Sequence, residues 1–310
     1  MNLTDPIFTD VNKAREHFEA TRWPNGPYCP HCGETERVYR LHGKSHRPGV
    51  VFCNACEKPF TVTVGTVMER SHVPPNKWAL AFRLMCSSKK GISAHQLHRT
   101  LAVTYKTAWF MAHSIREAMR PNSAGPLGGD NKVVEIDETY IGGKARNRKG
   151  RVPPNEAVVA LVERDGRVRS RHVANVDGAN LKPILKAEID NASYIMTDES
   201  PIYPGATAGF GGHGTVNHSI EKYVRGSFWH TNTVESYFSI LKRGVIGTYH
   251  HVSAEHLKRY LGEFDFRHDE RIALGVDDTQ RTAKAIKGAA GKRLTYQQTG
   301  RGWNEEEIPF

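Results

Sequence analysis

The chain has 310 residues, of which 38% are hydrophobic and 25% charged, a balance typical of a folded globular protein and not of a disordered one. It has no apolar run long enough to cross a membrane, and its N-terminus mixes charges where a secretory signal would be apolar, so we expect a cytoplasmic protein. The formal net charge of +10 and the pI of about 9.4 favour a polyanionic partner, nucleic acid first, over a merely soluble basic protein.

Composition and periodicity divide the chain into six segments. They are expected to be an N-terminal helical lead-in, a zinc ribbon, a helix-turn-helix, a linker, a larger α/β domain and a C-terminal tail, over residues 1–25, 26–70, 71–120, 121–131, 132–275 and 276–310 respectively.

The lead-in has Val11, Ala14 and Phe18 at helical spacing, and Trp23-Pro24 ends the run. The next segment contains two β-rich runs, VVFC and FTVTVGTVM, which predict short strands.

Two C-x-x-C pairs lie in this segment, Cys29 with Cys32 and Cys53 with Cys56. Each pair can bring two thiolates to one ion, so the spacing predicts a four-cysteine structural zinc site. A module this small buries too little apolar surface to fold unaided, and zinc would supply the missing stability. The alternatives are disulfides, which a reducing cytosol disfavours, and four unrelated thiols. Cys86 stands in an apolar run and is expected to be a buried, inert thiol.

Residues 71–120 are expected to form three helices. Pro74-Pro75 would open the first, Ser93 would cap the second, and a short link through Val103 and Thr104 leads into the third. A tight turn between the last two helices matches a DNA-reading helix-turn-helix, although a simple helical connector would look similar.

From residue 132 the pattern becomes α/β. Four runs predict strands, namely VVEIDETYI, EAVVALVERDG, RVRSRHVANV and SYIMT. Two runs predict helices, LKPILKAEI and TVESYFSILKR, and the glycine-rich PGATAGFGGHG is expected to be irregular.

Three acids stand out in this domain. Strand alternation places Asp137 on one face with Glu135 and Thr139, whereas Glu138 shares the opposite face with apolar neighbours. An acid in so apolar a strand is costly to bury unless a cation or a donor satisfies it; the alternative is an edge strand facing solvent. Asp198 ends a second apolar strand, a favoured place for a ligand site.

Glu235 begins an amphipathic helix. Its apolar stripe consists of Val234, Tyr237, Phe238 and Leu241. Glu235, Ser239 and Lys242 form an adjacent stripe, which could be either a catalytic edge or an ordinary solvated face. Three acids of this kind are the oxygen ligands that Mg²⁺ or Mn²⁺ prefers, and such ions serve phosphoryl transfer.

The sequence resembles the zinc-ribbon-bearing DDE transposases of bacterial insertion sequences, the ISXO-like group, over nearly its whole length. The resemblance rests on C-P-H-C, C-N-A-C, E-I-D-E-T-Y-I-G-G-K, T-D-E-S and H-T-N-T-V-E-S-Y-F-S-I-L-K-R-G-V-I-G-T-Y-H-H. It implies a ribonuclease-H-like catalytic domain over residues 132–275, whose Mg²⁺ or Mn²⁺ ligands would be Asp137, Asp198 and Glu235. It also implies a DNA contact for Lys242 near the cut. Glu138 and Glu199 are the neighbouring acids that could replace a ligand.

Basic residues near the proposed site are expected to contact DNA phosphates, with a solvated loop as the alternative. They are Lys144, Arg146, Arg148, Lys149, Arg151, Lys242 and Arg243.

We therefore expect a nucleoid-associated transposase that cleaves double-stranded DNA at the element's terminal inverted repeats. The freed 3′-hydroxyl strand would then be transferred into target DNA by a homodimer or higher assembly. One rival is a zinc-ribbon DNA-binding regulator whose ribonuclease-H-like domain is not catalytic. Another is a nuclease of the same fold that cuts without strand transfer.

Overall fold

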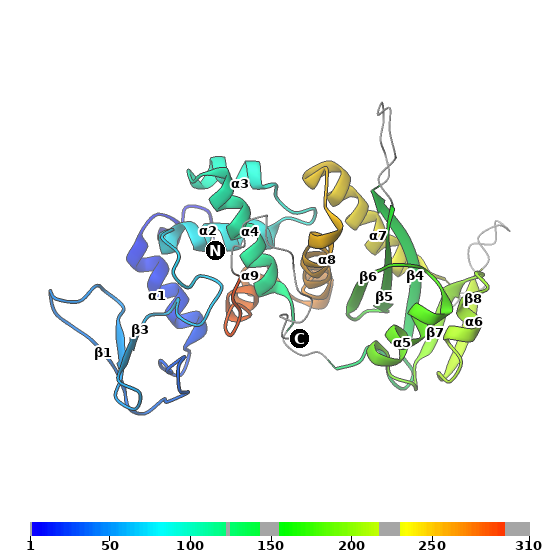
Figure 1. Ribbon diagram of the computed structural model, residues 1–310, viewed down its shortest axis with the longest axis horizontal. Coiled ribbons are helices and arrows are strands. Elements are labelled where there is room, and N and C mark those ends of the chain that lie inside the picture. The colour runs from blue at the N-terminus through cyan, green and yellow to red at the C-terminus, as the bar shows by residue number, and fades with distance from the viewer. Residues whose placement is uncertain (1, 122–124, 143–154, 217–229, 295–310) are drawn as a thin grey trace.

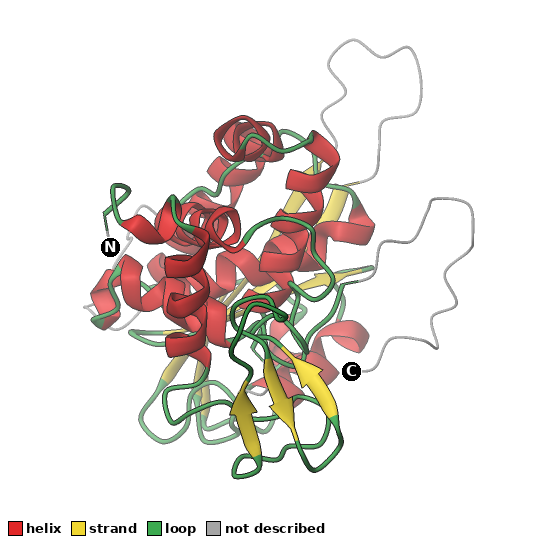
Figure 2. Cartoon of the chain, turned by 90° about the vertical axis from the view of Figure 1, so that its left-hand side faces the viewer, coloured by secondary structure: helices red, strands yellow, loops and turns green. Residues whose placement is uncertain are grey.

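The structure is a computed structural model that describes residues 2–121, 125–142, 155–216 and 230–294. Three parts follow one another along its longest axis (Figure 1): a small sheet at one end, a group of helices in the middle and a larger sheet at the other end. Seen from the end that carries the small sheet, its three strands lie in front of the helices (Figure 2). Within the described ranges, no helix has the length and apolar character needed to cross a lipid bilayer.

The helices of the N-terminal half begin at local signals in the sequence. They are η1 (Pro6–Phe8), α1 (Val11–Arg22), α2 (Pro75–Ser87), α3 (Ala94–Leu101) and α4 (Tyr105–Met119). Asp10, Ser93 and Thr104 cap α1, α3 and α4 by accepting hydrogen bonds from backbone amides of the first turn. The stripe expected on α1 is correct for Ala14 and Phe18, which are buried, but Val11 is 46% exposed.

The small sheet has three antiparallel strands in the order β1-β2-β3. They span Val38–Arg40, Val51–Cys53 and Lys58–Phe60. The strand expected over FTVTVGTVM is wrong beyond Phe60, because residues 61–68 form turns. Gly65 has a positive φ of 68°, which interrupts an extended run, and the consecutive residues Thr66, Val67 and Met68 are all buried instead of alternating between two faces.

The segment expected as a C-terminal tail contains a helix, α9 (Asp278–Lys287). Its buried residues Ala285 and Ile286, followed by Ala289, belong to the same core as Phe18 and Phe82. The end of the described chain therefore completes the core of the N-terminal helices.

The larger sheet has five strands in the order β6-β5-β4-β7-β8. They are β4 (Val133–Gly142), β5 (Asn155–Glu163), β6 (Val168–Val173), β7 (Tyr194–Asp198) and β8 (Gly212–Val216). β4 is antiparallel to β5, and β5 to β6, whereas β7 and β8 continue the sheet in parallel. β4 is thus the central strand, where the two kinds of pairing meet.

Helices cover both faces of this sheet. The elements are α5 (Gly178–Glu188), α6 (Tyr203–Ala206), α7 (Asn232–Gly244), the π-helical turn η2 (Val245–Tyr249), α8 (Ala254–Asp269) and η3 (Ile272–Leu274). Val134 and Ile136 of β4 pack with α5 and α6, whereas Val158 and Ala160 of β5 pack with α7 and α8. The two faces of the strands therefore meet different helices, as strand alternation requires.

The stretch over residues 204–214, expected to be irregular, contains parts of α6 and β8. Its many glycines do not suggest a strand from the sequence, and one of them, Gly211, is required by close packing against another segment. A Cβ on Gly211 would lie 2.5 Å from the carbonyl oxygen of Ala192, so only glycine allows this close approach.

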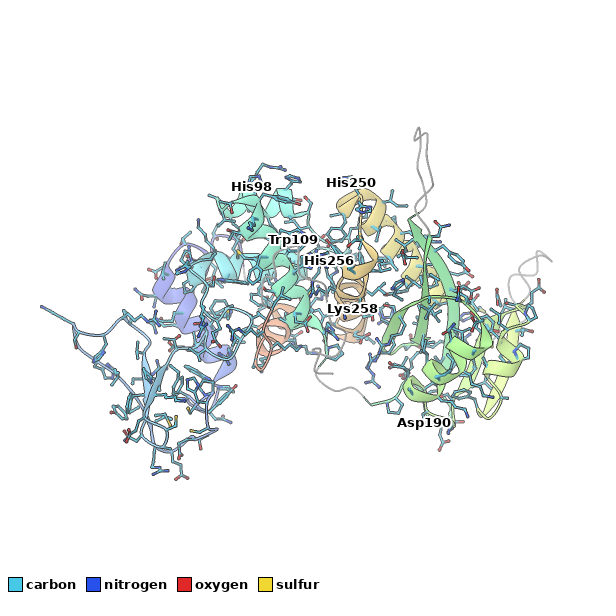
Figure 3. The ribbon with its side chains drawn as sticks, in the orientation of Figure 1. His98, Trp109, Asp190, His250, His256 and Lys258 are labelled. Atoms are coloured by element: carbon cyan, nitrogen blue, oxygen red, sulfur yellow. The ribbon has the colours of Figure 1, made fainter. Side chains whose placement is uncertain are left out.

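A buried ion cluster joins the helical middle part to the larger sheet. Glu263 of α8 is fully buried and accepts hydrogen bonds from Arg116 Nε of α4 at 2.7 Å, from Tyr249 at 2.7 Å and from Arg267. Burial raises the pKa of Glu263, but Arg267 and Arg116 more than offset this and hold it below its usual value. Trp109 and His256 lie between the same two helices (Figure 3), with ring centroids 5.4 Å apart.

We predict that Glu263→Ala lowers the free energy of unfolding by about 3–5 kcal/mol, because it leaves two buried guanidinium groups without their anion. Urea denaturation checks this. The matched control is Glu255→Ala on the exposed first turn of the same helix, expected to cost less than about 1 kcal/mol. Equal losses for the two variants would contradict a special role for the cluster.

Candidate active site

The two cysteine pairs meet in the small sheet region. Their Sγ atoms all lie within 4.8 Å of one another, with Cys29 and Cys56 3.6 Å apart and Cys32 and Cys53 3.7 Å apart. These separations are far too long for disulfides. Four sulfurs at about 2.3 Å from one tetrahedral ion would be about 3.8 Å apart, so the four cysteines fit a closed zinc site. Cys86 lies elsewhere, fully buried, and burial raises the pKa of its thiol to about 12, as expected for an inert thiol.

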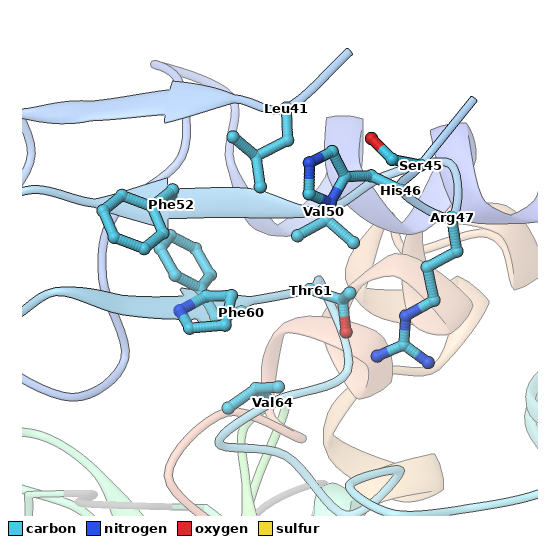
Figure 4. Close-up of a pocket in the computed structure, with 10 residues that line it drawn as sticks. Leu41, Ser45, His46, Arg47, Val50, Phe52, Phe60, Thr61 and Val64 are labelled. Atoms are coloured by element: carbon cyan, nitrogen blue, oxygen red, sulfur yellow. The ribbon is translucent and has the colours of Figure 1, made fainter. Parts of the chain in front are cut away.

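A cavity of about 430 Å³ lies beside the same sheet (Figure 4). It is lined by Leu41, Ser45, His46, Arg47, Val50, Phe52, Pro59, Phe60, Thr61 and Val64. These residues are mainly apolar and include no acid, so the cavity does not provide a site for divalent-metal chemistry.

The three acids singled out in the larger domain come from different elements. Asp137 lies within β4, Asp198 is the last residue of β7, and Glu235 is in the first turn of α7. Parallel pairing aligns Glu135 with Met196, and Asp137 and Asp198 each lie two residues further along these adjacent strands. The helix α7, which carries Glu235, packs on the sheet face opposite to that of Val134 and Ile136.

The charges of these acids act on one another. Burial raises the pKa of Asp137 to about 7, and repulsion from Glu138, Asp198 and Glu235 adds to the effect, although the backbone N–H of Glu138 donates to Asp137 Oδ1 at 2.8 Å. Anions held this close favour a cation between them. Among the described residues, however, the four cysteines are the only group of three or more side chains whose ligand atoms all lie within 4.8 Å of one another. The carboxylate oxygens of the three acids therefore do not all lie within that distance.

The competing acids differ in their surroundings. Glu138 faces the opposite side of β4, where the hydroxyl of Tyr203 donates a hydrogen bond to its carboxylate. Burial raises the pKa of Glu138, and Asp198 contributes to the rise. Glu199 is exposed beyond the end of β7. Glu235 is also exposed, but unlike the other two it belongs to a helix packed on the face that Asp137 shares.

The sequence did not predict a role for Glu135. It is fully buried two residues before Asp137, and its carboxylate accepts hydrogen bonds from backbone amides at the start of α7. Its position on the same strand face as Asp137 was visible in the sequence, but its long-range contact with α7 was not.

The basic residues divide into two groups. Lys242 and Arg243 are exposed in the last turn of α7. The predicted phosphate contacts at Lys144, Arg146, Arg148, Lys149 and Arg151 lie outside the described residues.

Two parts of the chain match models of known protein families. Residues 126–269 match the ISXO2-like transposase domain, and residues 10–59 match the transposase zinc-ribbon domain. The chain is also 28% identical over 290 residues to an uncharacterized protein in transposable element ISH50 of Halobacterium salinarum, an alignment that covers 84% of this chain and 92% of that protein. The chain thus contains a segment that matches the ISXO2-like transposase domain family, preceded by a segment that matches the transposase zinc-ribbon family.

We predict about one zinc ion per chain, because the four thiolates form one closed ligand set. Cys53→Ser should lose the zinc and unfold the small sheet, whereas Cys86→Ser should keep it. Metal analysis of the purified proteins, with near-ultraviolet circular dichroism, tests both. Full zinc content in a Cys29→Ser, Cys53→Ser double variant would rule out this site.

Proposed function

We propose that this protein is an active DNA transposase that hydrolyses a phosphodiester at each insertion-sequence end and then transfers the strand. In the first step water attacks phosphorus and the bond to the 3′ oxygen breaks, which frees a 3′-hydroxyl. In the second step that hydroxyl attacks a phosphodiester of target DNA and displaces a new 3′ oxygen. Both are in-line displacements, which need positioning and charge neutralisation more than acid–base groups.

The observation that supports this proposal is that Asp137 and Asp198 lie on adjacent strands and Glu235 at the start of α7, where the charges of the latter two add to the effect of burial in raising the pKa of Asp137. A mixed five-stranded sheet with helices on both faces supports the ribonuclease-H-like assignment.

The donor set fits Mg²⁺ or Mn²⁺, because these ions prefer carboxylate oxygens and the three acids would supply them. When bound, such ions activate the attacking oxygen and stabilise the leaving one. The contribution of the chain is to hold three negative side chains on rigid elements, two on adjacent strands and one at the start of a packed helix.

The exposed end of α7 is the proposed DNA contact near the cut. Lys242 lies seven residues after Glu235, about 10 Å further along the helix, and Arg243 follows it. Two cations at this distance can hold the phosphates that flank the cleaved bond.

The helices α3 and α4 are the proposed DNA-reading helix-turn-helix. They are joined through Ala102, which has a left-handed φ of 47°, and they expose Arg99, Tyr105 and Lys106 around the turn. His98 of α3 lies on the same side of the molecule as His250, which follows η2 (Figure 3). DNA bound on this side would contact both the helical part and the larger domain. A homodimer or higher assembly would bring two element ends together.

We predict that Glu235→Gln abolishes Mg²⁺-dependent cleavage and strand transfer while end binding stays nearly intact, because one of three negative charges at the metal site is lost. The assay uses labelled element ends, with binding followed in parallel in Ca²⁺.

Glu199→Gln is the control and should cleave normally. Lys242→Ala should impair positioning of the DNA end while the metal affinity is kept. Wild-type cleavage by Glu235→Gln with an inactive Glu199→Gln would show that the third ligand is misassigned. A wild-type protein that binds ends without cutting them would favour the regulator.

We also predict that neutralising Arg146 and Arg148 weakens binding to all DNA sequences alike, because phosphate contacts carry no sequence information. The slope of log affinity against log salt concentration should become shallower by about one unit for each phosphate that the variant no longer neutralises. Fluorescence anisotropy at several salt concentrations measures this slope. An unchanged slope would place both side chains in solvent.

A further inference from the structure

Glu135 is a fully buried carboxylate at the junction between the central strand and α7. Its Oε2 atom accepts hydrogen bonds from the amides of Thr233 at 2.8 Å and Val234 at 3.0 Å. Its Oε1 atom accepts from the Thr233 hydroxyl at 3.0 Å and from Arg164 Nε at 2.6 Å. Two helix amides, one hydroxyl and one guanidinium thus converge on a single side chain.

These bonds replace the local cap of α7. Within the described residues, the side chain of Thr231 at the N-cap position makes no capping hydrogen bond, and its hydroxyl donates instead to Glu235 Oε1 at 3.0 Å. The first amides of a helix need acceptors, and a negative charge there also interacts favourably with the helix dipole. Glu135, almost a hundred residues earlier, meets both needs.

Arg164 fixes the other side of the same junction. It neutralises Glu135 through Nε, and its Nη2 atom donates to the carbonyl oxygen of His230 at 2.7 Å. His230 immediately precedes Thr231, so this hydrogen bond holds the backbone just before α7 begins. One strand acid and one arginine therefore set both the position and the direction of the helix start.

We propose that Glu135 is a positioning residue of the metal site, and that its bonds to α7 hold Glu235 in place relative to Asp137. This inference rests on the proposed function. Glu135 and Asp137 project from the same strand face, two residues or roughly 6.8 Å apart. Glu235 directly follows Val234, whose amide Glu135 binds. One proposed ligand therefore belongs to this strand, and another is tied to it through Glu135.

The test measures Mn²⁺ affinity of the zinc-loaded, full-length protein without DNA, by electron paramagnetic resonance of the free ion. Glu135→Gln should raise the Mn²⁺ Kd about tenfold or more, the usual effect of removing a group that orients a metal ligand. Glu263→Gln is the matched control, because it neutralises an equally buried acid in the cluster between α4 and α8. Its Mn²⁺ Kd should stay at the wild-type value.

A second pair of variants avoids the problem that Glu135→Gln could fail to fold. Thr233→Val removes one hydrogen bond to Glu135 while keeping the backbone amide, and should raise the Mn²⁺ Kd in the same direction by a smaller factor. Its control is Thr282→Val, which removes a hydroxyl of a buried threonine in α9. That control should bind Mn²⁺ as the wild type does.

Glu235→Gln separates this inference from the proposed function. If Glu235→Gln binds Mn²⁺ as tightly as the wild type, the proposed ligand set fails. If Glu235→Gln binds weakly but Glu135→Gln and Thr233→Val bind normally, the ligand set stands and the positioning role is overturned. An equal loss of affinity in Glu263→Gln would also overturn it, because the effect would then be a general loss of stability.

Discussion

The arrangement around the larger sheet depends on how β4 accommodates its acids. Three of them, Glu135, Asp137 and Glu138, lie within four residues of the central strand, where an unsatisfied charge costs several kcal/mol. Arg164 and the start of α7 satisfy Glu135, and the Tyr203 hydroxyl satisfies Glu138. Burial, together with repulsion from neighbouring acids, raises the pKa of Asp137. Two of the acids therefore fix surrounding elements, and the third defines the candidate metal site.

The same principle operates where the larger domain meets the helical part. Glu263 is as deeply buried as Glu135, and two arginines and a tyrosine hydroxyl surround it. Its charge is satisfied within the chain and leaves no need for a cation. Asp265, on the same helix, also accepts hydrogen bonds from the hydroxyls of Tyr237 and Ser170, although its burial raises its pKa to about 7. Burial alone does not mark a metal site. The neighbouring charges distinguish Glu263, which lies beside two arginines, from Asp137, which lies beside other acids.

The sequence was sufficient to predict features that depend on local spacing. The cysteine pairs, the cap Ser93 and the buried stripe of α7 all follow from residues close together in the chain. The strand β8 was missed because the close approach that requires Gly211 involves residue 192, in a different segment. The contact between Glu135 and α7 was missed for the same reason, since nothing near position 135 indicates which donors its carboxylate meets. The ligand roles of Asp137, Asp198 and Glu235 remain predictions.

The return of α9 to the N-terminal helices has a consequence for synthesis of the protein. Ala285, Ile286 and Ala289 complete the core that contains Phe18 and Phe82, yet they leave the ribosome only after the whole larger domain has been made. A nascent or prematurely terminated chain lacks these side chains and keeps apolar surface of α1 and α2 open to water. The core of the N-terminal helices is therefore complete only in chains in which the larger domain, with its acids, has already been synthesised.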